Sequence, residues 1–207
     1  MSEAELTTAP LKLEIFHSDV PIWEISSLQR LADEDLELAP MRIVPASAED
    51  AFYRLNNLPD QLSSLFARVD ASFPDEDDIE ELAPQAQQLL KRHYLLDEFI
   101  DQFYGALEDL PSALRVRRCE TEGQRVIKGR PALIALKDIW TNEWSFDALM
   151  NRLKRTKSIA LNAAPVIIGV ADEAPASPEV QERVQTILGS QVSVWMHDEL
   201  GITRLSR

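Results

Sequence analysis

The chain of 207 residues carries 35 acidic and 21 basic side chains, which gives a net charge of −14 at neutral pH. Hydrophobic residues make up 45% of the chain and charged residues 27%, proportions typical of a soluble protein with a packed core. The longest stretch of low charge, residues 158–171, is shorter than the roughly 20 apolar residues that cross a bilayer, so we expect no contact with a membrane.

Two features of the sequence bear on the cellular compartment. Cys119 is the only cysteine, so an internal disulfide is excluded and a reducing compartment is favoured. The start of the chain holds two acidic side chains and lacks the basic and apolar regions of a secretory signal. We therefore expect a cytoplasmic location.

The charge is unevenly distributed along the chain. Residues 1–110 contain 24 acidic and 7 basic side chains, a net charge of −17, whereas residues 111–207 contain 11 acidic and 14 basic ones, a net charge of +3. Such an acidic half repels nucleic acid and other anionic surfaces, and the other half does not. The simpler alternative is that the acidic residues only keep the protein soluble.

The first half of the chain is predicted to be mainly helical. Alternating apolar residues predict a strand at 11–16, and a second short strand is predicted at 41–46. Helical spacing and capping residues predict helices that begin near Pro21 or Ser26, at Ser47 and at Asp60, and a long helix from Pro84 to about Asp109. The acidic segment 73–84 contains two prolines, so we place a boundary there between an acidic α/β N-terminal region, 1–83, and an α/β core domain, 84–207. The alternative is one continuous domain.

The second half reads as alternating strands and helices. Strands are predicted at 113–120, at 124–131 as a return strand, and at 131–140, an apolar stretch that holds Lys137 and Asp138 near its end. Helices are predicted at 145–157 and at 177–189, and an unbroken apolar run predicts a buried strand at 164–172. This strand, the next helix and a strand at 191–199 read as a right-handed parallel unit. The fold class is therefore α/β, with a mixed sheet flanked by helices in the C-terminal half.

This order of elements, over residues 84–198, resembles the restriction-endonuclease-like nuclease core. The resemblance implies a strand that carries an acid-x-Lys triplet, in which the acid binds a divalent cation and the lysine positions water. The corresponding triplet here is Ala135-Leu136-Lys137, with alanine in place of the acid. A methyl group cannot hold a hard cation. An acid could instead come from Glu120, Glu122 or Asp138, or from Glu98 or Asp101 of the preceding helix.

A second candidate site consists of Asp172, His197 and Asp198. If their two strands were parallel, these side chains would lie at the carboxyl ends, where open α/β sheets bind ligands. An acid and a histidine there could perform acid–base chemistry or hold a metal. The alternative is that polar residues simply mark the points where strands meet water.

Basic and aromatic side chains form a third set of candidates. Clustered cations could bind phosphates, or could neutralise the acidic half of the same chain. Aromatic residues are enriched at protein interfaces, although paired tryptophans can equally close a core. The candidate binding residues are Trp140, Trp144, Arg115, Arg117, Arg118, Arg152 and Arg155, with Arg125, Lys128, Arg130, Lys154 and Lys157 nearby in the sequence.

The sequence favours a non-catalytic intracellular adaptor or regulatory protein that acts through protein–protein contacts within a larger assembly. It shows no glycine-rich phosphate loop and no cysteine cluster, so we expect neither a cofactor nor a metal. The protein partner is unspecified, and the basic half could also bind nucleic acid. The alternative is a divalent-metal-dependent nuclease or phosphodiesterase that uses Glu120, Glu122, Lys137 and Asp138, or a degenerate nuclease-like nucleic-acid binder.

Overall fold

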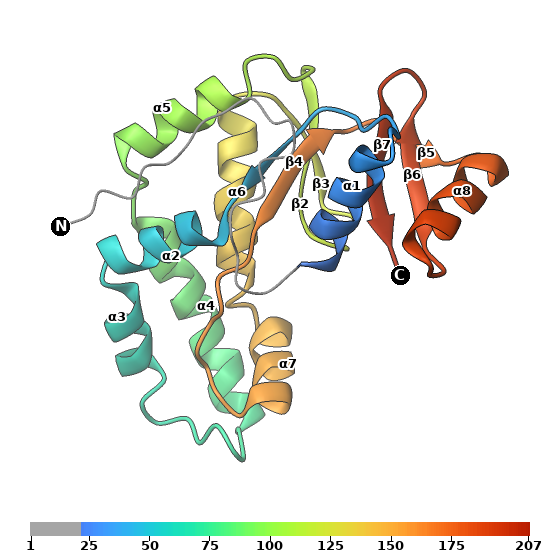
Figure 1. Cartoon of the computed structure of the whole chain (residues 1–207). Coiled ribbons are helices and arrows are strands. Elements are labelled where there is room, and N and C mark those ends of the chain that lie inside the picture. Colours follow the sequence, from blue (N-terminus) through green and yellow to red (C-terminus); the bar gives the residue numbers. More distant parts are fainter. Residues whose placement is uncertain (1–21) are drawn as a thin grey trace. The chain divides into compact units, whose positions relative to one another are not determined.

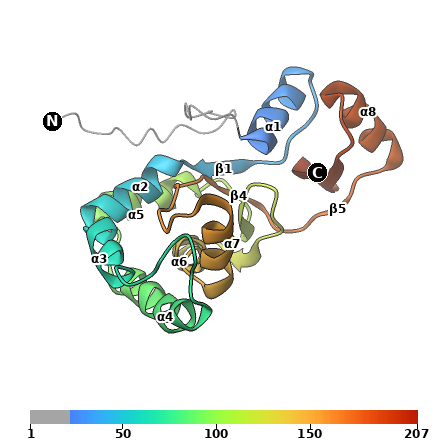
Figure 2. The same ribbon diagram turned by 90° about the horizontal axis from the view of Figure 1, so that it is seen from below.

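The computed structural model describes residues 22–207, which form eight helices and seven strands in two antiparallel sheets (Figures 1 and 2). The mixed α and β class predicted from the sequence is confirmed, and the described part of the first half is the more helical one. The strand predicted at 11–16 lies outside the described residues. No helix within residues 22–207 is both long and apolar enough to span a membrane.

The chain divides into two compact units, each built from separate segments. Of the described residues, unit 1 holds 22–45, 97–135 and 165–207, and unit 2 holds 46–96 and 136–164. The domain boundary predicted between residues 83 and 84 does not coincide with a boundary of these units. It falls inside a continuous helix, α4 (Glu76–Arg92).

Unit 1 contains both sheets. The four-stranded sheet has the order β1-β4-β2-β3, and the three-stranded sheet has the order β5-β6-β7. A core of apolar side chains from α1, β6, β7 and α8 includes Leu28, Leu31, Val184 and Leu205. The elements of this unit are α1 (Trp23–Asp33), β1 (Met41–Val44), α5 (Asp97–Ala106), β2 (Ala113–Arg118), β3 (Gln124–Ile127), β4 (Val166–Val170), β5 (Ala174–Pro175), α8 (Pro178–Leu188), β6 (Ser193–His197) and β7 (Gly201–Ser206).

Unit 2 is helical. Figures 1 and 2 show its helices gathered around the later part of α6, whose first residues belong to unit 1. Phe52, Leu58, Leu90 and Leu149 are among its buried side chains. The elements are α2 (Ala46–Leu55), α3 (Leu58–Leu65), α4 (Glu76–Arg92), α6 (Arg130–Asn142) and α7 (Phe146–Thr156).

Two helices with predicted serine caps form where the sequence predicts them, whereas Ser47 and Asp60 lie inside α2 and α3 rather than at their caps. The Ser145 hydroxyl accepts a hydrogen bond from the Ala148 amide, and α7 follows it. Ser177 caps α8 in the same way, and Gly189 ends it with a positive φ of 68°. Because the capping side chain satisfies an amide that has no partner within the helix, these starts can be read from local sequence alone.

The strand predicted at 131–140 is wrong, because this stretch forms α6. Its buried side chains are Ala132, Ala135, Leu136 and Trp140, which recur at intervals of three and four residues. This spacing puts them on one face of a helix, whereas a strand would bury alternate residues. Lys137 therefore lies on a helix rather than at a strand end.

The single long helix predicted from Pro84 to Asp109 is also wrong. Asp75 caps α4 by accepting a hydrogen bond from the Asp77 amide at 3.0 Å, so this helix starts well before Pro84, which lies inside it. The helix ends at Arg92, and α5 begins separately at Asp97. The capping carboxylate and the acidic first turn favour the earlier start, because both stabilise a helix N-terminus.

The parallel unit predicted between residues 165 and 197 is wrong as well. β4 lies in the four-stranded sheet, between β1 and β2, and pairs antiparallel with both. β6 lies in the other sheet and pairs antiparallel with β5 and β7. The short strand β5 and the hairpin between β6 and β7 supply partners for β6, so β4 and β6 do not pair.

Candidate functional site

Lys137 is engaged with the end of a neighbouring helix in unit 2. Its ammonium group donates hydrogen bonds to the carbonyls of Lys91, at 3.0 Å, and of His93. These carbonyls belong to the last turn of α4 and its C-cap, where helix carbonyls lack partners within the helix. Burial lowers the pKa of Lys137, and Asp138 partly offsets that effect. The local geometry gives Lys137 a structural role as a cation at a helix C-terminus.

We expect Lys137→Met to lower the free energy of unfolding by about 1.5–3 kcal/mol, because hydrogen bonds from a charged group contribute that much. Urea denaturation followed by circular dichroism measures the change. Lys154→Met is the matched control, since Lys154 is exposed in the last turn of α7. Equal midpoints for the two variants would contradict the structural role of Lys137.

The acids proposed to assist Lys137 are divided between the two units. Glu120 and Glu122 lie in the turn between β2 and β3 of unit 1, whereas Asp138 lies on the part of α6 that belongs to unit 2. The Glu120 amide donates to the Glu24 carboxylate, and the Glu122 carbonyl accepts from Arg115 at 3.3 Å. Within residues 22–207, no three His, Cys, Asp or Glu side chains lie together in a way that could hold a metal ion.

Arg117 forms a buried ion pair with Glu24 of α1. Both guanidinium Nη atoms donate to the carboxylate at 2.7 Å, and the side chains are 3% and 0% exposed. The same carboxylate accepts the backbone amides of Glu120 at 2.6 Å and Leu205 at 3.1 Å. Arg117 therefore joins α1 to β2 and β7 and is not available at the surface.

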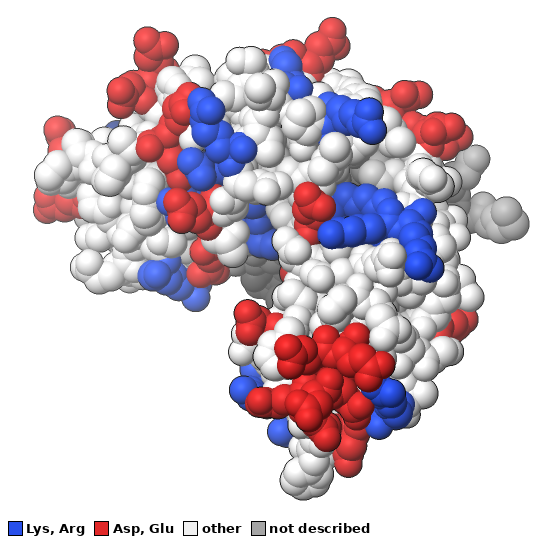
Figure 3. Space-filling view, turned by 180° about the vertical axis from the view of Figure 1, so that it is seen from behind, with Lys and Arg blue, Asp and Glu red and all other residues white. Residues whose placement is uncertain are grey.

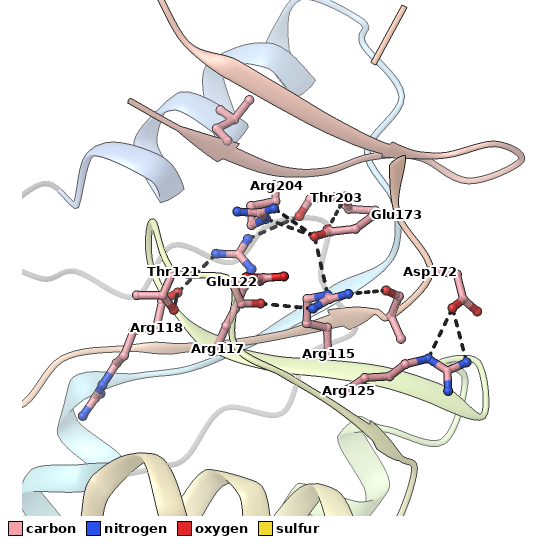
Figure 4. Close-up of polar contacts among 12 residues, drawn as sticks. Arg115, Arg117, Arg118, Thr121, Glu122, Arg125, Asp172, Glu173, Thr203 and Arg204 are labelled. Carbon is pink, nitrogen blue, oxygen red and sulfur yellow. Dashed lines mark hydrogen bonds and ion pairs between the residues drawn. The ribbon is translucent and has the colours of Figure 1, made fainter. Parts of the chain in front are cut away.

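Arg115 belongs to a second cluster, around Glu173 (Figure 4). The Glu173 carboxylate accepts from the Thr203 hydroxyl at 2.9 Å and from Arg204 at 3.1 Å, and Arg115 approaches it at 3.5 Å. The Arg204 guanidinium also lies over the Trp195 ring, 3.7 Å from its centroid. These contacts join the segment after β4 to the three-stranded sheet.

The other basic candidates of unit 1 lie nearer to solvent. Figure 4 shows the Arg118 side chain directed away from the Glu173 cluster. Arg125 donates to the Asp172 carboxylate at 3.2 Å, and both side chains are exposed. Lys128 donates to the carbonyls of Glu108 at 3.0 Å and Leu110 at 2.6 Å. Arg130 is exposed at the start of α6.

Asp172, His197 and Asp198 lie at one end of the β5–β6 pair. Asp172 precedes β5, and His197 ends β6, which is antiparallel to β5, so the three come to the same end although the strands are not parallel. Local contacts involve two of them. Asp172 bonds to Arg125, and the His197 Nδ1 atom accepts the Glu199 amide at 3.2 Å in the β6–β7 turn.

The two candidate tryptophans, Trp140 and Trp144, are both buried in unit 2. Trp140 is 1% exposed, and its ring centroid lies 5.4 Å from that of Phe52. The Trp144 indole donates to the Tyr53 hydroxyl at 2.6 Å, and this hydroxyl donates to the Trp140 carbonyl at 3.5 Å. Burial raises the pKa of Tyr53, and the hydrogen bond from Trp144 only partly offsets that effect, so the phenol is neutral at physiological pH.

Arg152 is also committed within unit 2. It donates to the carbonyls of Ile159, at 2.9 Å, and Glu143, and its guanidinium carbon lies 4.9 Å from the Trp144 ring centroid. Burial lowers the pKa of Arg152. Arg155, on the last turn of the same helix, is exposed.

A pocket of about 280 Å³ lies beside Trp144 and Tyr53 in unit 2. Tyr53 and Glu49 reach it from α2, Leu62 reaches it from α3, and Ile159 and Leu161 reach it from the segment that follows α7. Glu49 is fully buried, and its carboxylate accepts the Ala164 amide at 3.0 Å. A concave, mainly apolar site with a few placed polar groups is the usual form of a ligand site.

Sequence reasoning found Trp144 but missed the other walls of this pocket. Glu49 and Tyr53 lie four residues apart on α2, so the helical period does place them on one face. The sequence contains no signal that brings that face to Trp144, which lies far along the chain. Searches with this chain match no model of a protein family and no curated protein.

Proposed function

We propose that this protein is a non-catalytic adaptor or regulator that acts inside the cell through protein–protein contacts. The observation that carries the proposal is an acidic cluster at the start of α4, formed by Asp75, Glu76, Asp77, Asp78, Glu80 and Glu81. Figure 3 shows acidic side chains gathered in one area of the surface, where the chain enters α4.

Part of this acidic cluster forms no ion pair with the described residues. Asp78 and Glu81 pair with Arg68, at 3.0 Å and 2.5 Å. Glu76, Asp77 and Glu80 are exposed, and their carboxylates form no ion pair with any residue between 22 and 207. Their negative charge therefore faces solvent.

An exposed aromatic side chain lies next to the acidic cluster. Phe73 is 84% exposed and precedes the cap of α4 by two residues. Aromatic side chains are enriched at protein interfaces. Phe73 and the neighbouring carboxylates therefore suit a partner that presents an apolar site next to basic side chains.

Several of the cations considered for catalysis or nucleic-acid binding make internal contacts. Lys137 bonds to the end of α4, Arg117 to Glu24, and Arg152 to backbone carbonyls. These contacts favour recognition over hydrolysis, because the same groups would otherwise have to face a substrate. Electrostatic attraction would mainly raise the association rate and the specificity.

The test begins with capture of a stoichiometric partner from native extract, followed by measurement of its affinity in purified form. We expect the triple variant E76Q/D77N/E80Q to bind at least about tenfold more weakly than the wild type at low salt, with little difference at high salt. The matched control E98Q/D101N/E108Q removes three exposed acids elsewhere. Equal affinities for the two variants, or no stoichiometric partner, would contradict the proposal.

A further inference from the structure

The pocket beside Trp144 has a buried floor and a half-buried wall. The floor consists of buried side chains from α2, α3 and the turn before α7, namely Glu49, Tyr53, Leu62 and Trp144. The wall comes from the segment that follows α7, through Ile159, Leu161 and Ala163. The volume of about 280 Å³ exceeds the roughly 150 Å³ of a cavity that holds benzene, so a larger body than one ring fits.

Polar contacts hold this wall at both of its ends. The Ile159 carbonyl accepts a hydrogen bond from Arg152 at 2.9 Å, and the Ala164 amide donates to the Glu49 carboxylate at 3.0 Å. Leu161 lies between these two anchors and lines the pocket. Because the wall is fixed before a ligand arrives, binding loses little free energy to ordering it.

Each charged side chain that lines the pocket interacts with an opposite charge. Burial lowers the pKa of Arg152, and electrostatic attraction to Glu49 acts in the opposite direction, so these two groups interact favourably. Asp50, on the exposed rim, pairs with Arg54 at 2.6 Å. A charged ligand would therefore lose hydration without meeting an unpaired opposite charge among the described lining residues, and this desolvation is costly.

The neutral polar groups of the pocket are engaged in the same way. The Trp144 indole donates to the Tyr53 hydroxyl at 2.6 Å, and this hydroxyl donates to a backbone carbonyl of α6 at 3.5 Å. The Arg152 guanidinium lies over the Trp144 ring, 4.9 Å from its centroid. The Ser158 hydroxyl accepts the Ala160 amide at 3.0 Å. What the pocket offers an occupant is therefore mainly apolar surface.

We propose that this pocket binds a neutral, mainly apolar molecule about as large as a pair of fused aromatic rings. The rings would lie against Leu62, Ile159 and Leu161, where burial of apolar surface supplies the affinity, and a neutral polar group would reach the exposed rim at Ser63. A free small molecule and an aromatic side chain of a partner protein share this chemistry. The inference does not depend on the acidic cluster of α4 or on its partner.

A series of three ligands with the same ring system tests the preference for a neutral molecule. The probes are 2-(1-naphthyl)ethanol, 2-(1-naphthyl)ethylamine and 1-naphthylacetate, which are neutral, cationic and anionic at pH 7, and the full chain is titrated with each by calorimetry. We expect the alcohol to bind at least about tenfold more tightly than either charged analogue. A charged analogue that binds as tightly as the alcohol, or no alcohol binding up to its solubility limit, would overturn the proposal.

The indole N–H resonances of the tryptophans report where the alcohol binds. Trp144 lines the pocket, whereas Trp23 and Trp195 belong to unit 1. In ¹H–¹⁵N spectra of the full chain, we expect the alcohol to shift the Trp144 indole resonance and to leave those of Trp23 and Trp195 in place. Shifts in unit 1 without a shift of Trp144 would contradict the assigned site.

Two variants with matched controls tie the binding to this pocket. Ala163→Phe fills the cavity and should abolish alcohol binding, whereas Ala67→Phe, in the exposed turn after α3, should leave it unchanged. Leu161→Ala removes part of the wall and should weaken binding at least about threefold. Leu65→Ala, a change at a half-buried leucine of the same unit outside this pocket, should have no effect on binding. Wild-type affinity in both Ala163→Phe and Leu161→Ala would place the alcohol elsewhere and refute the proposal.

The source of the apolar body is decided by a peptide arm. An acetylated and amidated tripeptide with 1-naphthylalanine between two alanines is compared with the alcohol in the same titration. Tighter binding of the peptide supports a partner's side chain as the ligand, and the reverse order supports a free small molecule. If neither binds, or if Ala163→Phe binds both as the wild type does, the assignment of an apolar ligand site fails.

Discussion

Replacing Glu24 with glutamine is expected to lower the free energy of unfolding of unit 1 by about 3–5 kcal/mol, as found when one partner of a buried ion pair is removed. The carboxylate accepts four hydrogen bonds, two from Arg117 and two from backbone amides. A glutamine cannot neutralise the guanidinium, and its amide group turns a donor toward other donors. Urea denaturation measures the loss, and hydrogen exchange of peptides from α1, β2 and β7 locates it.

Two further variants make the test of this ion pair specific. Glu34→Gln, at the exposed C-cap of the same helix, should change stability by less than about 0.5 kcal/mol. The double variant E24Q/R117M should be less destabilised than the sum of its single changes, because removal of both charges leaves neither unpaired. If Glu24→Gln costs less than about 1 kcal/mol, the ion pair is not a main contact of unit 1.

Replacing Trp140 with alanine is expected to destabilise unit 2 by about 3–5 kcal/mol, the usual cost of such a truncation in a core. The side chain is 1% exposed and packs against Phe52. Its loss leaves a cavity between α6 and α2 that these helices cannot fill without moving. Hydrogen exchange of α2 and α7 peptides should speed up by several orders of magnitude.

Tyr94→Ala is the matched control for the Trp140 variant, because Tyr94 belongs to the same unit and is 86% exposed. It should leave the exchange rates of α2 and α7 near those of the wild type. If α2 and α7 exchange as slowly in Trp140→Ala as in the wild type, Trp140 lies at a surface. That outcome would agree with the interpretation of Trp140 as an interface residue.

Local signals explain which elements could be predicted from the sequence. Ser145 and Ser177 mark helix starts through side-chain caps, and the apolar run before Asp172 marks β4, because these effects act over a few residues. The stretch that forms α6 is ambiguous in the sequence, since residues 131–136 are all apolar and short apolar runs fit either structure. The helical period shows in Ala132, Leu136 and Trp140, which are buried at intervals of four residues.

The polar contacts could not be predicted for a different reason. The Arg117 and Glu24 side chains form hydrogen bonds although they are 93 positions apart in the sequence, and Arg204 and Glu173 do so across 31 positions. A row of arginines on a strand has the same local pattern whether it faces phosphates or buried carboxylates. The choice depends on which elements the fold brings opposite the strand, and the sequence of the strand does not contain that information.

The most direct test of recognition against hydrolysis is a cleavage assay on the purified full chain. Plasmid and single-stranded DNA are incubated with the protein and Mg²⁺ or Mn²⁺, together with the variants Lys137→Ala and Asp138→Asn. We predict no cleavage above buffer for any of the three proteins and no stoichiometric binding of Mn²⁺. Metal-dependent cleavage by the wild type that both variants lose, with a divalent ion held by acidic groups beside Lys137, would contradict the proposed function.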